Sequence, residues 1–228
     1  MNFDPILISL KTAAVSIVLI FVIGTLLAYA MYRMKNGKLK SALDALFTLP
    51  LVLPPTVAGF FLLYIFGLYR PVGSFLADLG IKIVFNWEAT VLAATVIALP
   101  LMYRSAKAAF MQVDPIYIQA ARTIGLSQFQ IVKKILLPLA SPGLTSGGIL
   151  AFSRALGEFG ATAMIAGNMA GQTRTMPLAI YSAVAGGRME EAYGYVAILC
   201  AVSFFFVFIM DFVSEYKARK YRMEVNTI

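Results

Sequence analysis

The chain has 228 residues, of which 60% are hydrophobic and only 13% are charged. This composition is too apolar for an ordinary soluble domain and indicates an integral membrane protein. The formal net charge is +8, histidine is absent and Cys200 is the single cysteine, which excludes imidazole proton relays, histidine metal sites and intrachain disulfides. The sequence also lacks a Walker-type glycine–lysine loop, so we expect no ATPase site, no metal and no cofactor in this chain.

Five segments are predicted to cross the bilayer as helices, which makes the expected fold all-α. The runs 12–32, 45–69 and 192–210 carry no charge, and each is long enough for a crossing, which takes about 20 mostly apolar residues. The run 89–103 is long enough if its helix continues to residue 110, with Arg104 and Lys107 extending toward the interface. A shorter, glycine-rich crossing is expected from Pro142 to Gly157.

The distribution of Lys and Arg predicts the orientation of these crossings. Segments 33–44, 104–141 and 217–222 contain four, five and four of these residues, whereas the two intervening connections contain two each. Five crossings bring the three basic segments to one side, so the N-terminus is expected outside and the C-terminus in the cytoplasm. The stretch 159–173 is therefore interpreted as re-entrant or peripheral, because a sixth crossing there would move the basic tail across the membrane. The positive charge reflects this orientation, and no nucleic acid is expected as a partner.

The second crossing contains three prolines in the run LPLVLPPTVAGFFLL, namely Pro50, Pro54 and Pro55. Each removes a backbone donor, so we expect a kink, which lipid tolerates only where protein or a water-lined cavity satisfies the freed carbonyls. If the kink shapes a translocation pathway, the prolines and the adjacent Thr56 are candidate pathway residues; the alternative is a purely structural kink. Gly59 predicts a close helix contact one turn further on.

The basic loop 104–141 is predicted to form a helical hairpin. Asp114 can cap a helix that begins at Pro115, because proline is favoured at the first helical position. Gly125 is the expected left-handed end of this helix. Ser127 can cap a second helix, which is expected to run until Pro138 interrupts it.

The first helix of this hairpin presents small side chains that let another protein approach closely. Ala120, Ala121 and Ile124 are expected to form this low surface, with Arg122 supplying charge at its edge. A short helix of this kind can fit the groove of a partner protein. The alternative is an amphipathic hairpin that lies on the membrane or folds back on its own bundle.

A charged pair lies at the end of the fourth crossing. Arg154 and Glu158 are four residues apart and can pair on one helical face, which lowers the cost of charge at membrane depth. One interpretation is a structural ion pair near the outer end of this crossing. The other is that Arg154, with the hydroxyl groups of Ser153 and Thr162, helps an anion to pass, which makes these residues and Glu158 candidate pathway residues.

The spacing in QAARTIGLSQFQIVKKILLP resembles the EAA loop of ABC importer permeases. In that family the hairpin docks a membrane subunit onto the ATPase that powers it. The resemblance therefore implies an ATPase-coupling role for Asp114, Pro115, Gln119, Ala120, Ala121, Arg122, Gly125 and Pro138. The family usually has Glu where this chain has Gln119, so docking is expected to depend more on the shape of the helix than on a carboxylate.

The segments LPLVLPPTVAGFFLL, AFSRALGEFGATAMIAG and QTRTMPLAIY resemble the molybdate ABC transporter permeases, and the similarity extends over nearly the whole chain. This resemblance implies one permease domain over residues 1–228, with the type I ABC importer fold, in a prokaryotic cytoplasmic membrane. The implied partners are a second copy of the chain, two cytoplasmic ABC ATPases and an extracytoplasmic oxyanion-binding protein. The implied substrate is molybdate, with tungstate and sulfate left open because their permeases share this architecture.

An ion-coupled transporter or channel is the alternative from another functional class. It predicts acidic or histidine residues along the membrane interior, where Glu158 is the single acidic candidate. A membrane-embedded enzyme would need a cluster of nucleophile, base or metal ligands near one face, and the sequence has none. The expected role is therefore that of a transport subunit without catalytic residues.

Overall fold

The computed structural model describes the backbone of residues 2–225 and the side chains of residues 2–209 and 212. The described backbone is helical and contains no strand. The helices, in chain order, are α1 (Asp4–Arg33), α2 (Lys38–Val52), α3 (Pro55–Phe66), α4 (Pro71–Asp78), α5 (Trp87–Gln112), α6 (Pro115–Thr123), α7 (Gln128–Ile131), the π-helical turn η1 (Val132–Leu136), α8 (Leu137–Leu156), α9 (Gly160–Ile165), α10 (Met176–Ala185) and α11 (Met189–Val225).

Four helical segments are long and apolar enough to cross a membrane, namely Asp4–Arg33, Trp87–Gln112, Gln128–Leu156 and Met189–Ile209. A fifth crossing is obtained if the bent pair of α2 and α3 is counted as one span. The predicted all-α fold is thereby confirmed, and the four or five candidate crossings agree with the five that were predicted. The side chains of the basic segment 217–222 lie outside the described residues, although the helix α11 continues through that segment.

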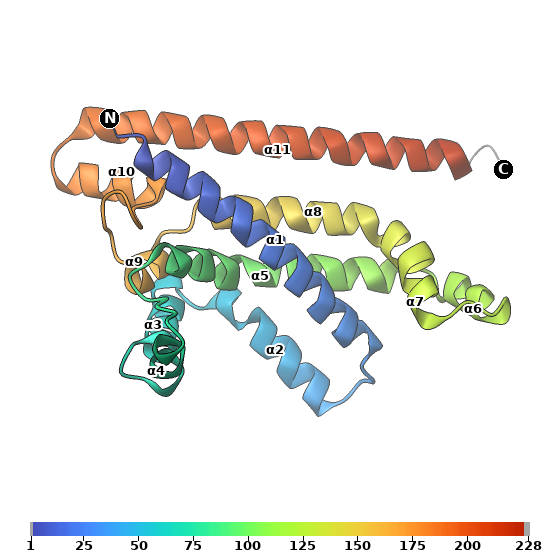
Figure 1. The fold of residues 1–228 in the computed structure, drawn as a ribbon. Helices are drawn as coiled ribbons and strands as arrows, with labels where there is room; N and C mark the ends of the chain where they lie inside the picture. The colour runs from blue at the N-terminus through green and yellow to red at the C-terminus, as the bar shows by residue number, and fades with distance from the viewer. Residues whose placement is uncertain (1, 226–228) are drawn as a thin grey trace.

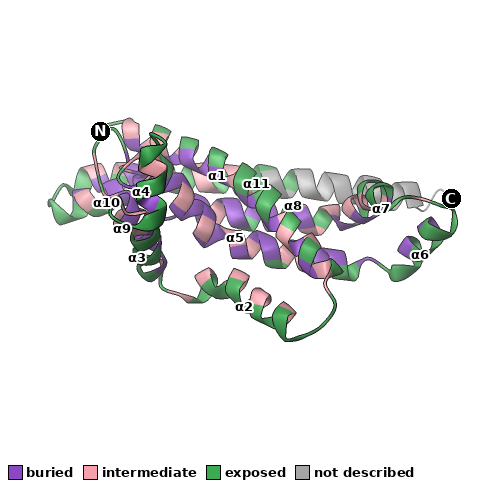
Figure 2. Ribbon diagram, turned by 60° about the horizontal axis from the view of Figure 1, so that its bottom comes forward, coloured by how far each residue is buried: buried purple, intermediate pink, exposed green. Residues whose placement is uncertain are grey.

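Helix α5 forms the centre of the bundle, with α1 and α8 packed against it (Figure 1). Small residues allow this close packing: a Cβ on Gly24 of α1 would lie 2.8 Å from Met102 Cγ, and one on Gly147 of α8 would lie 2.6 Å from Ser105 Cβ. Figure 2 shows buried residues along most of α5, while α2 has none. The apolar core therefore surrounds α5, and α2 stands at its edge.

The second crossing is broken rather than kinked. Helices α2 and α3 meet at an angle of 114° across Leu53 and Pro54, so α3 turns away from the direction of α2 (Figure 1). The prediction of a kinked continuous span is corrected in this respect. Two features explain the size of the bend: the prolines remove backbone donors at the junction, and α3 packs along α9 instead of continuing the bundle.

The fourth crossing, within Gln128–Leu156, is longer than expected, because Pro138 does not interrupt its helix. The backbone widens into a π turn over Val132–Leu136, where the N–H of Leu137 donates to the carbonyl of Val132. Pro138 then occupies one of the first positions of α8, and Pro142 is accommodated inside that helix. The widened turn accommodates the missing proline donor, so the second hairpin helix and the fourth crossing form one continuous rod.

The stretch 159–173 contains the six-residue helix α9 followed by a loop that leads into α10. Neither part is long enough to cross a bilayer. This agrees with its interpretation as a segment that does not form a sixth crossing. The helix lies beside α3 and the first part of α5 at the end of the bundle that carries the N-terminus (Figure 1).

Candidate functional site

Helix α6 begins and ends with the signals expected from the sequence. The Asp114 carboxylate accepts a hydrogen bond of 2.9 Å from the Ile116 N–H, and Pro115 occupies the first turn. At the other end Gly125 has a φ of +81°, in the left-handed region that favours glycine. The N–H of Leu126 donates to Ala121 O at 3.0 Å and that of Gly125 to Arg122 O at 3.0 Å, which is the Schellman pattern.

The second arm of the hairpin starts with a capping box. The Ser127 N–H donates to Gln130 Oε1 at 2.8 Å, and the Gln130 N–H donates to Ser127 Oγ at 3.4 Å. The side chain of Gln128 also donates to Tyr29 Oη of α1 at 3.2 Å. Backbone conformation and side-chain caps thus define the angle between the two arms, which project from one end of the bundle (Figure 1).

The exposed face of this hairpin differs in part from the expected one. Ala121 is 3% exposed and packs with Ile118 on the protein's own core, so it does not contribute to an outer surface. Ala120, Gln119, Arg122 and Gly125 are exposed as expected. Ile124, which was also expected on this surface, is 77% exposed. The sequence interpretation missed three further large apolar residues that are exposed on the hairpin, namely Ile116, Tyr117 and Phe129. Such a patch on a projecting hairpin is typical of a protein contact surface.

The opposite end of the molecule brings together the two stretches proposed for a pathway. Gly160 follows α8 and lies against the start of α3, where its Cβ would be 3.1 Å from Pro55 Cβ and 3.2 Å from the Thr56 nitrogen. Pro54 and Thr56 are exposed and Pro50 is half-buried. Although these residues are about a hundred positions from Gly160 in sequence, the α2–α3 bend and the α8–α9 junction are neighbours.

The charged pair at this junction forms as predicted. Arg154 Nη1 lies 2.7 Å from Glu158 Oε2, in an ion pair that is not aligned as a hydrogen bond. The Glu158 Oε1 accepts a hydrogen bond of 2.8 Å from the Ala161 N–H at the start of α9. The Glu158 side chain is 2% exposed and that of Arg154 is 31% exposed. The carboxylate therefore joins α8 to α9, while the Arg154 side chain remains partly exposed.

Two of the predicted pathway hydroxyls are either buried or bonded within their own helix. Thr162 is 1% exposed, and the Ser153 hydroxyl donates to Ile149 O of its own helix at 3.0 Å. Within one copy of the chain, Arg154 is 31% exposed and Ser153 is half-buried, and Arg154 is the charged group of this stretch that remains partly accessible to another molecule. Among the described residues there is no group of three His, Cys, Asp or Glu side chains that could hold a metal ion.

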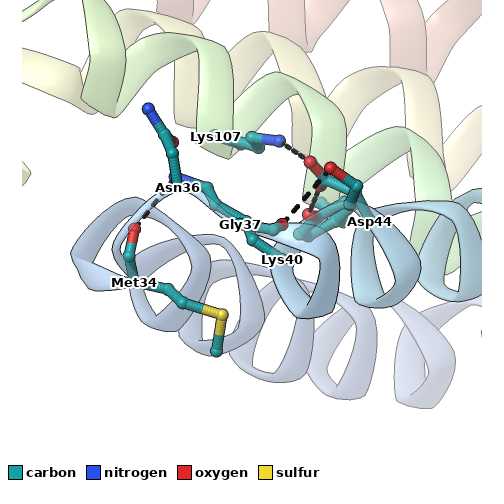
Figure 3. Close-up of polar contacts among 8 residues, drawn as sticks. Met34, Asn36, Gly37, Lys40, Asp44 and Lys107 are labelled. Carbon is teal, nitrogen blue, oxygen red and sulfur yellow. Dashed lines mark hydrogen bonds and ion pairs between the residues drawn. The ribbon is translucent and has the colours of Figure 1, made fainter.

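One polar contact was missed by the sequence interpretation. Asp44 of α2 accepts hydrogen bonds from Tyr103 and Lys107 of α5, so Lys107 pairs with a carboxylate instead of extending freely toward the interface (Figure 3). The signal that could have found it is a pair of opposite charges, Asp44 and Lys107, near the same end of two predicted crossings.

The contact between α3 and α9 depends on Gly59. A Cβ at this position would lie 2.6 Å from Ala161 Cα and 2.9 Å from its carbonyl oxygen, and backbone cannot yield as a side chain does.

We expect Gly59→Ala to destabilise the protein by about 1–3 kcal/mol, as overpacking does. The loss of stability is measured as a lower midpoint of thermal unfolding in nanodiscs. Gly148→Ala is the control, because its Cβ would meet only Phe21 at 3.6 Å, and an unchanged midpoint for Gly59→Ala would refute the close contact.

Comparison with known proteins places these features in a family. Residues 11–223 match the family described as "Binding-protein-dependent transport system inner membrane component". The chain belongs to this family. It is accordingly a multi-pass inner membrane protein, and the predicted resemblance to ABC importer permeases is confirmed.

Individual relatives of this transport-system family support the assignment over nearly the whole chain. The chain is 42% identical to the "Putative molybdenum transport system permease protein YvgM" of Bacillus subtilis, with 92% of each chain covered. It is 39% identical to the "Molybdenum transport system permease protein ModB" of Escherichia coli K12, covering 96% of this chain and 94% of that one.

Solved structures of other importers share the fold. A chain of the inward-facing MetNI methionine ABC transporter superposes with a TM-score of 0.74 at 21% identity, covering 93% of this chain and 94% of that one. A chain of a bacterial ABC transporter that imports alginate superposes with a TM-score of 0.73 at 16% identity, covering 94% and 79%. The fold is therefore that of a type I ABC importer permease, as predicted.

Proposed function

We propose that this chain is the membrane subunit of an ATP-driven importer of molybdate. The observation that carries the proposal is the hairpin α6–α7: a capped helix with a glycine elbow and an exposed apolar patch, set between two long helices of an inner membrane component. A transport subunit without an ATPase of its own needs such a contact surface for the subunit that hydrolyses ATP. The single permease domain is proposed to span residues 1–228.

The proposed orientation places the hairpin in the cytoplasm. The hairpin and the basic α1–α2 turn lie at one end of the bundle, and the N-terminus lies at the other (Figure 1). The positive-inside rule favours the first end as cytoplasmic. The N-terminus, the α2–α3 bend and the Arg154–Glu158 pair are then on the extracytoplasmic side, where a binding protein delivers the substrate.

Two copies of the chain are proposed to enclose the pathway. Helix α2 has no buried residue, and Leu46, Leu49, Leu51 and Val52 are all exposed along it. A second copy related by a two-fold axis can cover this face and provide the matching half of a passage. The α2–α3 bend, which contains the candidate pathway residues Pro54 and Thr56, would then lie near the axis.

The transport cycle follows from this arrangement. ATP binding closes the two ATPase subunits, which draws the two α6 helices together. Because α5 and α8 join the hairpin directly, they move with it and open or close the far end of the pathway. Arg154, whose side chain is partly exposed, supplies positive charge and hydrogen-bond donors for a passing oxyanion. A tight site is unnecessary, since the permease must release the anion.

Molybdate is preferred as substrate because the relatives named above are molybdenum transport permeases. Tungstate and sulfate are tetrahedral oxyanions of the same charge, so they remain candidate substrates that the binding protein can select. An ion-coupled mechanism is less well supported, because the buried Glu158 is already paired with Arg154 and bonded to the Ala161 N–H.

The test is coexpression of the chain with an ABC ATPase and an oxyanion-binding protein from the same genome. We expect the ATPase to copurify with the chain, and its activity to rise when the binding protein is loaded with molybdate or tungstate and to rise less with sulfate. Failure of any ATPase subunit to copurify would contradict the importer proposal. A larger response to sulfate would keep the importer but change its substrate.

A further inference from the structure

Helix α2 is attached to the rest of the chain by few contacts. It packs mainly against α5, and none of its residues is buried. The apolar part of the contact consists of Leu43 and Phe47, which are half-buried against the core, with the Phe47 ring 5.5 Å from that of Tyr103. A groove of ≈ 450 Å³ lies between the two helices, so close packing does not hold them together along this face.

The Asp44 carboxylate makes the polar part of the contact. Its Oδ1 accepts from the Tyr103 hydroxyl and its Oδ2 from Lys107 Nζ, so both oxygens are bound by α5 (Figure 3). The side chain of Asp44 is 31% exposed and that of Lys107 is 21% exposed, while Tyr103 is 1% exposed. Charges that are partly withdrawn from water attract more strongly than those on an open surface.

The neighbouring cation on α2 does not compete for Asp44. Lys40 Nζ donates instead to Met34 O at 3.1 Å and to Asn36 Oδ1 at 3.2 Å, so it stabilises the α1–α2 turn (Figure 3). Asp44 therefore bridges α2 and α5, whereas Lys40 makes hydrogen bonds within the α1–α2 turn.

The position of the bridge relates the two candidate functional regions. Lys107 is in the last turns of α5, which is joined to the hairpin helix α6 by Val113 and Asp114 alone. Asp44 lies on the helix that ends at the α2–α3 bend. Helix α2 follows the α1–α2 turn in the chain rather than the hairpin, so it needs a non-covalent link to move with α5.

We propose that the contact of Asp44 with Lys107 and Tyr103 is the positioning link that makes α2 and its bend follow the movement of α5 and the coupling hairpin. This inference rests on the proposed importer function and assigns a role to residues outside both the hairpin and the pathway. The three side chains touch neither substrate nor ATPase. They act by keeping α2 and α5 together as one unit.

The test uses the complete complex with its ATPase and binding protein, reconstituted in proteoliposomes. Asp44→Asn and Lys107→Met should lower the molybdate taken up per ATP hydrolysed about tenfold, within the range of coupling effects for residues that contact neither ligand. ATP hydrolysis and subunit assembly should persist. The exchange Asp44→Lys with Lys107→Asp should restore coupling in part, because the Tyr103 hydroxyl can also accept a hydrogen bond.

Lys40→Met is the matched control, since it removes a charge one turn away on the same helix and should leave coupling near the wild-type value. Wild-type uptake per ATP in Asp44→Asn would overturn the inference, as would an equal loss in Lys40→Met. If the wild-type complex shows no molybdate-dependent hydrolysis, the importer function itself fails, and the two failures are thereby distinguished.

If the Asp44→Asn variant does not assemble, a second measurement tests whether α2 and α5 move together. Spin labels are placed through Leu39→Cys and Met111→Cys, both at exposed positions of α2 and α5, in a Cys200→Ser background. The inference predicts the same distance between the labels in the nucleotide-free and ATP-trapped wild-type complex. A change in this distance on ATP trapping shows that α2 moves independently of α5 and overturns the link.

Discussion

Replacing Gly125 by valine is expected to abolish coupled uptake while ATP hydrolysis continues. Gly125 ends α6 with a φ of +81°, which a β-branched residue adopts only with strain of about 1–3 kcal/mol. The chain can relieve this strain by unwinding the Schellman turn, which changes the angle at which α6 meets its partner. Uptake per ATP hydrolysed, measured in proteoliposomes, reports the loss of coupling.

Gly37→Val is the matched control for this substitution. Both glycines lie in turns at the same end of the bundle, and a Cβ at either position meets no atom within 4 Å. They differ in backbone conformation, because Gly37 has a φ of 169°, which is extended backbone that any residue adopts. Normal coupling in Gly125→Val, or the same loss in Gly37→Val, would contradict the role of the elbow.

The second large effect is expected at Arg154. Its substitution by methionine leaves the Glu158 carboxylate, 2% exposed, without its counter-charge. Removing one partner of a buried pair typically costs about 3–5 kcal/mol, and we expect a loss of about 3 kcal/mol here because Arg154 is itself 31% exposed. The unfolding midpoint of the purified protein in nanodiscs should fall accordingly.

Glu158→Gln should be less damaging than Arg154→Met. The amide oxygen can still accept the Ala161 N–H, and the unpaired guanidinium can reach water. The double variant should therefore be more stable than Arg154→Met alone. If this stable double variant still transports molybdate at the wild-type rate, Arg154 is a structural partner of Glu158 and not part of the pathway. Equal stability of the two single variants would argue against the buried ion pair.

Much of the fold could be predicted from hydropathy and capping residues. The long apolar runs before Arg33 and after Met189 form helices as expected, because a run of that length has no other way to satisfy its backbone in lipid. The ends of α6 were equally predictable, since Asp114 and Gly125 act on their own backbone neighbours. Local signals were sufficient for these elements.

The α2–α3 bend and the continuous helix from α7 through α8 could not be predicted without knowledge of tertiary packing. Prolines at 50, 54 and 55 predict a kinked span, whereas the observed break of 114° accompanies the packing of Gly59 against Ala161, far along the chain. Pro138 predicts the end of a helix, yet the π turn before it allows the helix to continue. In both cases the proline removes a backbone hydrogen bond, and the packing of the surrounding helices determines whether the helix breaks or continues.

The candidate site was predicted best where its residues are close in sequence. The Arg154–Glu158 pair follows from helical spacing, whereas Asp44 and Lys107 are 63 residues apart and no local pattern joins them. The burial of individual hairpin residues could not be predicted either, because the residue spacing does not reveal that Ala121 faces the protein's own core. Contacts of this kind depend on how the helices cross.

The most direct test of the importer function is uptake of labelled molybdate into proteoliposomes that contain the chain with its ATPase. We expect uptake that requires both ATP on the ATPase side and the loaded binding protein on the other. The anion should accumulate against its gradient. Uptake that proceeds without ATP, or that follows an imposed ion gradient instead, would rule out an ATP-driven importer and favour an ion-coupled transporter or a channel.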